Sequence, residues 1–236
     1  MSVALAEGPA AVSIPASIME QLDKWVACHG NGSYVPADMQ PQGVLDLAPD
    51  YGIQQVREEI SELVHELHRR QLRGCALEIG LGFFGSTHFI WRHLFGRVIT
   101  VEKSIERCRE FARSYAAFSG GHWLGDDGHS AFIYGFSSEP RSVKMVYEAA
   151  GEQKLDFLFI DGDHTYQAVL CDWLLYHDLV RPGGIVAFHD AVTTDRYISE
   201  APILIDRLRS GQIDGTRYDV RYIRHSEHVG IAYYEA

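Results

Sequence analysis

The chain has 236 residues, a hydrophobic share of 46% and a formal net charge of -11 at pH 7. This length can bury the core of one large domain, and no uncharged apolar run approaches the roughly 20 residues that a membrane-spanning helix requires, so we expect no membrane partner. The acidic balance argues against a nucleic-acid partner, because phosphate binding needs a basic surface, and we expect a small-molecule substrate instead.

The N-terminal residues, 1–17, contain no Lys or Arg and include Pro9 and Pro15, so they do not resemble a secretory signal. The cysteines are widely separated and lack C-x-x-C spacing, which favours reduced thiols in a cytoplasmic protein. They are Cys28, Cys75, Cys108 and Cys171. The sequence does not set the oligomeric state, and a homo-oligomer stays open.

Helical spacing of apolar residues predicts two helices before the first strand, over residues 16–28 and 53–71. Gly74 ends the second of them. We accordingly divide the chain into an N-terminal extension or cap, residues 1–50, and a main domain, residues 51–236.

Strands and helices then alternate, which predicts an α/β fold with a parallel, doubly wound sheet. The predicted strands cover residues 76–79, 98–101, 122–124, 155–160 and 185–188, and the predicted helices cover 86–94, 104–118, 141–150, 165–179 and 201–210. The segment from Arg181 to Gly184 is expected to be a turn. Two closing strands, 218–223 and 228–234, predict an antiparallel hairpin at one edge of a mainly parallel seven-stranded sheet.

The glycine-rich stretch after the first predicted strand has the pattern of a nucleotide-binding turn. Gly80, Gly82 and Gly85 match G-x-G-x-x-G, followed by Ser86 at the start of a helix whose free N–H groups face the turn. Glu78 at the end of the strand would repel a dinucleotide pyrophosphate. A cofactor with cationic groups fits better, and S-adenosylmethionine carries a sulfonium and an ammonium.

Further acidic residues follow the next two predicted strands, at the sheet edge where doubly wound folds bind ligands. Glu102 lies about twenty residues beyond the glycine turn and can accept both hydroxyls of a ribose, which fits NAD as well as S-adenosylmethionine. Asp126 and Asp127 follow the third predicted strand, where Asp126 can accept from an adenine amino group. An ordinary polar turn explains these two aspartates as well.

The strongest local pattern comes after the fourth and fifth predicted strands. It consists of Asp161-Gly-Asp163-His164-Thr-Tyr166, the Arg-Pro-Gly-Gly turn and the pair His189-Asp190. Together with the glycine motif, these residues resemble class I S-adenosylmethionine-dependent O-methyltransferases of the group that contains macrolide-sugar methyltransferases and cephalosporin-hydroxylase-like proteins. The resemblance covers roughly residues 50–236 and implies the Rossmann-like methyltransferase fold.

The resemblance also implies roles for the individual residues. Asp161 and Asp190 would bind Mg²⁺, His164 would deprotonate the substrate hydroxyl, and His189 stands where metal-dependent members have a glutamate. Because magnesium prefers oxygen ligands, a metal site that includes His189 would bind it weakly, prefer Mn²⁺ or bind no metal. Asp163 would orient His164 or act as the base itself, and a simple helix cap is the alternative for Asp161 and Asp163.

These observations lead to three hypotheses. The first is an S-adenosylmethionine-dependent O-methyltransferase that acts on a hydroxyl of a small molecule, such as a sugar or natural product, with or without a divalent metal. The second is an NAD(P)-dependent oxidoreductase, against which Glu78 and the cluster at Asp161 and His164 argue. The third is an S-adenosylmethionine-binding protein without catalytic turnover. No motif identifies the acceptor.

Overall fold

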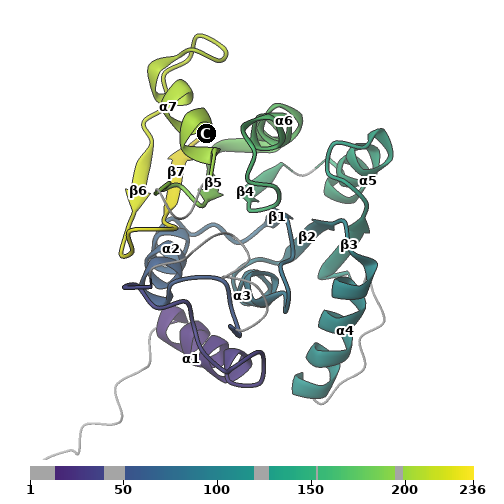
Figure 1. Cartoon of the computed structure of the whole chain (residues 1–236). Helices are drawn as coiled ribbons and strands as arrows, with labels where there is room; N and C mark the ends of the chain where they lie inside the picture. Colours follow the sequence, from purple (N-terminus) through teal and green to yellow (C-terminus); the bar gives the residue numbers. More distant parts are fainter. Residues whose placement is uncertain (1–13, 40–50, 120–127, 153, 195–198) are drawn as a thin grey trace, which may run out of the picture.

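The protein, seen here in a computed structural model, is a seven-stranded sheet with helices on both faces (Figure 1). The structure describes residues 14–39, 51–119, 128–152, 154–194 and 199–236. The strand order is β3-β2-β1-β4-β5-β7-β6, which confirms the predicted doubly wound sheet. The strands are β1 (Cys75–Ile79), β2 (Arg97–Glu102), β3 (Ser130–Tyr134), β4 (Leu155–Ile160), β5 (Val180–His189), β6 (Arg221–Ile223) and β7 (Ile231–Glu235).

The first five strands run parallel, and the hairpin of β6 and β7 adds two antiparallel pairings beyond β5. All residues of β1 and β4 are buried, as expected of parallel strands covered on both faces. Ile79 pairs with Val101 of β2 and with Ile160 of β4. The carboxyl ends of these three strands therefore lie at the same edge of the sheet, and the following residues meet there.

Two hydrophobic clusters divide the helices between the two faces of the sheet. Apolar side chains of α1, α2, α3 and α4 pack on one face with Phe157 and Phe159, and those of α5, α6 and α7 pack on the other with Leu158 and Ile160. The helices are α1 (Ile14–Val26), α2 (Arg57–Arg69), α3 (Ser86–Leu94), α4 (Ile105–Ser119), α5 (Pro140–Ala150), α6 (Tyr166–Tyr176) and α7 (Ala201–Ser210). None of the helices within the described ranges is long and apolar enough to cross a membrane.

Helix α1, which belongs to the predicted N-terminal extension, shares the core of the main domain. Trp25 is fully buried and stacks on Phe89 of α3, with 4.7 Å between the ring centroids. Its indole Nε1 donates to Ser86 Oγ at 3.1 Å, and Ser86 Oγ donates in turn to the carbonyl of Gly52 at 2.8 Å. The extension therefore contacts the start of the helix that follows the glycine turn.

Two predicted elements differ from the structure. The helix predicted over 53–71 begins at Arg57, because Val56 has the extended conformation of an N-cap residue and the segment before it packs into the core. The third strand is Ser130–Tyr134, not 122–124, which lies outside the described residues. Tyr134 in this edge strand is 56% exposed, so the strand is not buried throughout as β1 and β4 are.

The predicted Arg181–Gly184 turn is part of strand β5. Val180 pairs with Leu155, and Ile185 pairs with Phe157, so the four residues 181–184 of β5 lie opposite the single residue Asp156 of β4. Asp156, in the irregular stretch, accepts from Arg181 Nε at 2.5 Å and from the backbone of Gly74 at 2.6 Å. The glycines therefore form a bulge at the start of the strand rather than a separate turn.

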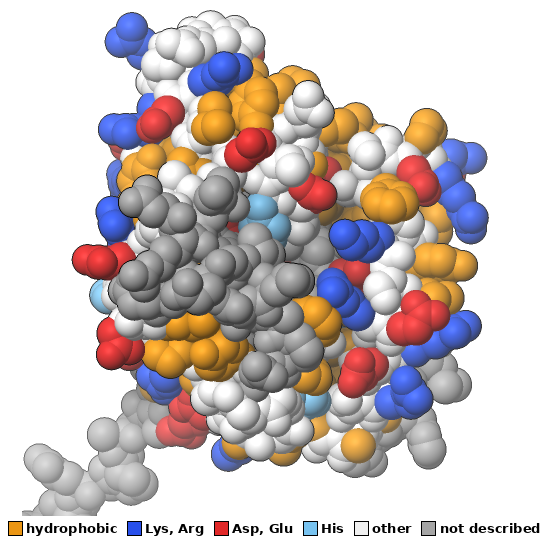
Figure 2. Space-filling model, viewed as in Figure 1, with side chains coloured by type: hydrophobic (Ala, Val, Ile, Leu, Met, Phe, Trp, Pro, Cys, Tyr) orange, Lys and Arg blue, Asp and Glu red, His pale blue; other side chains and the backbone are white. Residues whose placement is uncertain are grey.

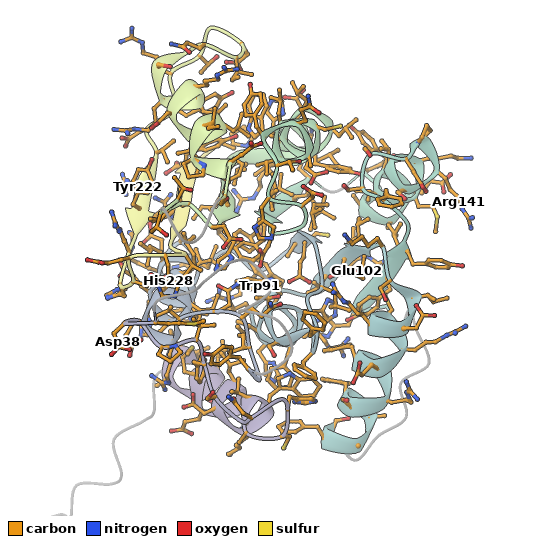
Figure 3. All side chains as sticks on the ribbon, viewed as in Figure 1. Asp38, Trp91, Glu102, Arg141, Tyr222 and His228 are labelled. Atoms are coloured by element: carbon orange, nitrogen blue, oxygen red, sulfur yellow. The ribbon has the colours of Figure 1, made fainter. Side chains whose placement is uncertain are left out.

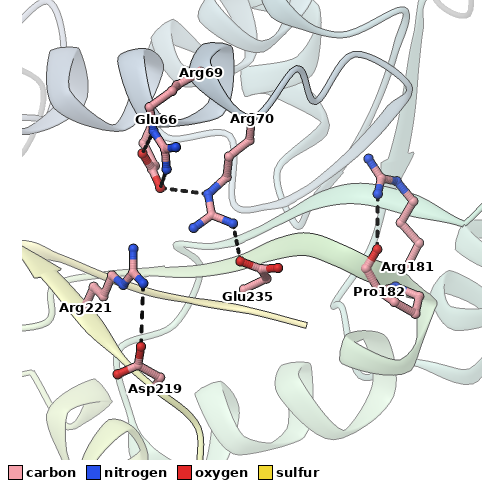
Figure 4. Close-up of polar contacts among 8 residues, drawn as sticks. All are labelled: Glu66, Arg69, Arg70, Arg181, Pro182, Asp219, Arg221 and Glu235. Atoms are coloured by element: carbon pink, nitrogen blue, oxygen red, sulfur yellow. Dashed lines mark hydrogen bonds and ion pairs between the residues drawn. The ribbon is translucent and has the colours of Figure 1, made fainter.

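An ion-pair network joins the hairpin to helix α2 (Figure 4). Arg70 Nε is 2.7 Å from Glu66 Oε1, and Arg70 also donates to Glu235 at the end of β7. Hydrogen bonds from Arg69 and Arg70 lower the pKa of Glu66 to about 2. Because Arg70 is largely buried, it connects the last strand to the helix that packs beside it.

Candidate functional site

Four predicted side chains meet beyond the carboxyl ends of β4 and β5. His164 Nδ1 lies 2.5 Å from Asp190 Oδ2, and His189 Nδ1 lies 3.2 Å from both Asp190 Oδ2 and Asp161 Oδ1. Because ionised carboxylates only accept hydrogen bonds, each imidazole donates through Nδ1. The structure thus brings together Asp161, His164, His189 and Asp190, as expected from their positions after adjacent strands.

Charges within this cluster change the pKa of each member. Burial alone would lower the pKa of His164, but the charge and hydrogen bond of Asp190 raise it to about 9. Burial would likewise lower the pKa of His189, yet Asp161 and Asp190 raise it well above the ordinary value. The pKa of Asp190 lies well below its usual range, because the two histidines outweigh the effect of burial. Burial raises the pKa of Asp161 despite the nearby His189.

Asp190 has an uncommon backbone conformation. Its φ is +53°, in the left-handed region that non-glycine residues rarely adopt. Such strain persists at functional sites only where the surrounding structure holds it. Here the conformation places the buried carboxylate of Asp190 between His164 and His189.

Asp163 serves a different purpose from that of its neighbour His164. Asp163 Oδ1 accepts from the backbone N–H of Thr165 at 2.9 Å and from its hydroxyl at 2.7 Å. These hydrogen bonds lower the pKa of Asp163. The Thr165 hydroxyl in turn accepts from Ala168 N at the start of α6. Asp163 therefore stabilises the helix start, and Asp190, not Asp163, orients His164.

The donor set of the cluster can be compared with the needs of a metal ion. Within the described residues, one ligand atom each from Asp161, His164 and Asp190 lie within 4.8 Å of one another. His189 contacts both carboxylates but does not belong to this group of three, and its Nε2 is buried without a hydrogen-bond partner. Carboxylate oxygens with imidazole nitrogen fit a divalent transition metal such as Mn²⁺, whereas Mg²⁺ prefers oxygen ligands.

The glycine motif forms a loop over a small pocket beside this cluster. Gly80, Gly82 and Gly85 all have positive φ, as predicted for a tight turn between β1 and α3. The pocket is lined by residues 52–55, residues 81–87 and Asp161. It therefore lies between the glycine loop and the acidic end of β4.

Glu102 and Glu78 support this loop from the protein interior. Glu102 Oε2 accepts from Leu81 N at 2.9 Å, and its Oε1 accepts from Ser104 N at 2.8 Å. Glu78 is fully buried and accepts from Trp91 Nε1 at 3.0 Å and from Thr100 Oγ1 at 2.7 Å. Figure 3 shows Trp91 and Glu102 in the interior near the ends of β1 and β2.

These positions modify the expected cofactor contacts. Glu78 points toward α3 and β2, so its negative charge acts from below the loop rather than at the exposed strand end. Ser86 is 4% exposed and its hydroxyl contacts Trp25 and Gly52, so it connects the loop to the N-terminal helix. Asp126 and Asp127 lie outside the described residues and precede β3 in the chain rather than following it.

Three buried polar residues next to the site were not predicted. Gln55 Nε2 donates to Asp161 Oδ2 at 3.2 Å, Glu59 is fully buried in α2, and His228 is buried with no hydrogen-bond partner at either ring nitrogen. Figure 3 places His228 on the side of β6 and α2. Glu59 could have been found from the sequence, because it lies on the same helical stripe as Val56 and Leu63.

A buried carboxyl of α6 lies below the loop that carries His164. Asp172 is 2% exposed, and burial raises its pKa to about 6 despite a hydrogen bond with Ser137. A carboxyl group whose pKa is higher in the folded state than in the unfolded state favours folding most where it is protonated, below its unfolded pKa. This contribution to the free energy of unfolding is lost as the pH rises through the folded pKa.

Asp172→Asn is therefore expected to stabilise the protein at pH 7.5 by up to about 3 kcal/mol relative to the wild type, with little difference near pH 4. Urea unfolding followed by circular dichroism at both pH values measures this effect. Asp178→Asn is the control, because that side chain is 86% exposed. An equal effect of Asp172→Asn at both pH values would contradict the prediction.

Residues 77–191 match a family model described as a methyltransferase domain. The matched segment starts in β1, ends directly after Asp190 and contains the glycine loop and the whole cluster. The match covers residues 77–191, which is 115 of the 236 residues and just under half of the chain. This segment is therefore similar to methyltransferase domains, and the sheet order with its reversed strand agrees with that similarity.

Solved structures of several methyltransferases share the fold of this protein at low sequence identity. An O-methyltransferase from Bacillus cereus in complex with SAH is 16% identical, with a TM-score of 0.57 over 93% of this chain and 91% of that chain. The SAH-bound methyltransferase PaMTH1 of Podospora anserina is 14% identical, with a TM-score of 0.54 over 95% and 89%. TomG from Streptomyces achromogenes, in complex with SAM, is 17% identical, with a TM-score of 0.52 over 73% and 77%.

A short stretch of the chain also matches a viral protein. It is 53% identical over 36 residues to an uncharacterized protein of Acanthamoeba polyphaga mimivirus. The match spans 15% of this chain and 16% of that protein, so the chain matches about one sixth of the viral protein's length.

Proposed function

We propose that this protein transfers the methyl group of S-adenosylmethionine to a hydroxyl oxygen of a small molecule of the sugar or natural-product class. The observation that carries the proposal is the pair of His164 and Asp190, which has the arrangement of an oriented general base. The adjacent glycine loop supports a nucleoside cofactor one strand away. The SAH-bound and SAM-bound relatives support S-adenosylmethionine as that cofactor.

In the proposed reaction, His164 acts through its Nε2 atom. Its Nδ1 donates to Asp190 at 2.5 Å, and the side chain is 30% exposed, so the opposite side of the ring is available to a substrate. The neutral imidazole takes the proton of the substrate hydroxyl at Nε2. The hydroxyl oxygen attacks the sulfonium methyl carbon, and the carbon–sulfur bond breaks with its electron pair moving to sulfur. Asp190 stabilises the imidazolium that forms.

Asp161 and Asp190 would hold a divalent cation, with a nitrogen of His189, which contacts both carboxylates, as a third donor. When bound, the cation lowers the pKa of a coordinated hydroxyl and so assists its deprotonation. The mixed donor set favours Mn²⁺ over Mg²⁺ at this site. Gln55, which donates to Asp161, keeps that carboxylate in position.

A small-molecule acceptor also suits the surface of the protein. Figure 2 shows basic and acidic side chains interspersed on one face instead of a single large basic area. The net charge of -11 points in the same direction, since nucleic-acid binding requires an excess of basic residues.

Calorimetry tests the cofactor. S-adenosylmethionine and S-adenosylhomocysteine are expected to bind, and Gly82→Ala is expected to weaken both about tenfold or more, because a methyl group would project into the cofactor loop. The fold should survive this change with a loss of about 1–2 kcal/mol from the φ of +68°, since the nearest atom to the added Cβ is Gln54 Oε1 at 3.5 Å. NADH serves as the comparison ligand. Binding of NADH without S-adenosylmethionine binding would favour an oxidoreductase and contradict the proposal.

A further inference from the structure

The carboxylate of Glu59 lies inside the protein and forms several hydrogen bonds to one loop. Its Oε1 accepts from the backbone N–H of His225 and of Ser226, both at 2.8 Å, and from the Ser226 hydroxyl at 2.9 Å. Its Oε2 accepts from the backbone N–H of Gly230 at 3.1 Å. A buried carboxylate needs such donors to offset its lost hydration. Glu59 therefore holds the loop of residues 225–230 against α2.

The same loop is bonded to the chain directly after the proposed catalytic residues. Ala191 N donates to the carbonyl of Gly230 at 3.2 Å, and Val192 N donates to the carbonyl of Val229 at 2.9 Å. On the other side of Asp190, His189 pairs with Ile231 across strands β5 and β7. Ala191 is thus attached to the segment that Glu59 holds, and His189 pairs with Ile231, the residue directly after that segment.

This attachment matters because Asp190 has a strained backbone. A φ of +53° at a residue with a side chain is kept only when its neighbours are held in place. Its carboxylate, 2.5 Å from His164 Nδ1, must stay within hydrogen-bond distance to keep the imidazole oriented. A small rotation of the backbone at Asp190 would move its carboxylate away from His164.

We infer that Glu59 is a positioning residue for the methyl transfer. It acts through the loop of residues 225–230, which fixes the backbone around Asp190 and so the orientation of His164. The inference rests on the proposed role of His164, but the geometry behind it does not depend on a cofactor or acceptor.

The test compares Glu59→Gln with Glu62→Gln. Glutamine at position 59 keeps the shape of the side chain but replaces one acceptor oxygen with an amide that faces the N–H groups of the loop. Glu62 lies on the same helix and contacts the side chain of His225 in the same loop, but it is 53% exposed. The two variants therefore make the same chemical change, Glu59→Gln at the buried contact with the loop and Glu62→Gln at the exposed surface.

The readout is the Nδ1 proton resonance of His164 in protein labelled with ¹⁵N-histidine, assigned by its loss in His164→Ala. A short, charge-assisted hydrogen bond to Asp190 moves this proton strongly downfield. Glu59→Gln is expected to shift the His164 Nδ1 proton resonance upfield, or to abolish it because the proton exchanges with water. The same variant is expected to speed hydrogen exchange at the backbone amides of Ala191 and Val192 more than tenfold. Glu62→Gln is expected to leave both unchanged.

An unchanged His164 resonance in folded Glu59→Gln protein would overturn the inference, even if the variant melts at a lower temperature. Ser226→Ala covers the case in which Glu59→Gln does not fold. It removes only one of the four donors, so we expect the same changes to a smaller degree, and an unchanged resonance there is equally decisive. The measurement uses the protein without ligands, so a failure of S-adenosylmethionine binding would overturn the proposed function separately.

Discussion

His164→Ala is expected to lower the rate of methyl transfer by about two to four orders of magnitude, because it removes the general base while Asp190 stays in place. The affinity for S-adenosylhomocysteine should stay within about threefold, since His164 lies outside the pocket beside the glycine loop. The assay follows formation of S-adenosylhomocysteine with a panel of sugar and natural-product hydroxyl acceptors. The best acceptor of the wild type is then used for the variants.

The pH dependence of the wild type gives a second check on the same residue. With a pKa of about 9, His164 is largely protonated at pH 7 in the protein without ligands, and only the neutral form can take a proton. The rate in metal-free enzyme should therefore rise with pH until about pH 9. A profile that is flat between pH 6 and 9 would contradict His164 as the base.

Two control variants separate the alternatives for this site. Asp163→Asn should change the rate only a few-fold, because asparagine can also accept from Thr165 and preserve the helix start. His65→Ala should have no effect, since His65 is an exposed residue of α2. If Asp163→Asn abolishes the reaction and His164→Ala does not, the base is Asp163. Loss of Mn²⁺ binding in His164→Ala would instead make His164 a metal ligand.

Gly80→Ala is expected to destabilise the fold by about 3–5 kcal/mol or to prevent folding. A Cβ atom at this position would lie 2.1 Å from the carbonyl oxygen of Asp161, which belongs to the backbone and cannot move aside. Gly80 N also donates to Val101 O, and Asp161 N donates to Ile79 O, so the strand ends are bonded on both sides. The φ of +93° adds a penalty of its own for a residue with a side chain.

Gly151→Ala is the matched control for this prediction. Gly151 also has a positive φ, +63°, but no atom lies within 4 Å of an added Cβ. We expect a loss of about 1–3 kcal/mol from the backbone conformation alone, because φ +63° with ψ −146° is a combination that side chains disfavour. Urea unfolding followed by circular dichroism measures both variants. Equal free energies of unfolding for the two variants would contradict the prediction, because the backbone at Asp161 would then move away from the added Cβ atom without loss of stability.

Most strands and helices of the sheet were predictable from the sequence. Strands β1, β4 and the second half of β5 are short, mostly apolar runs between helical patterns. This alternation is visible in the sequence before the fold is known. Strand β3 was not predicted although Ala131, Phe132 and Ile133 are apolar, and its pairing with β2 identifies it. The start of α2 was also misplaced, since Ile53 and Val56 continue the helical spacing but are buried in a loop.

For the site, the sequence by itself determined which residues follow the strand ends, because parallel strands place their carboxyl ends at one edge. Asp161, His164, His189 and Asp190 were found in this way. Only the tertiary structure decided the pairing of His164 with Asp190, which requires the left-handed backbone at Asp190. Spacing along the chain carries no information about such a contact.

The same division holds for the residues that support the site. Glu78 and Glu102 stood out as acidic residues after strands, but their burial and their bonds to Thr100 and Leu81 depend on the neighbouring strand and loop. Glu59 lies 166 residues before His225, its partner in the loop next to β7. The sequence therefore determined the fold class and the candidate residues, whereas hydrogen bonds between distant segments decided which of them orient the base and which hold the backbone around it.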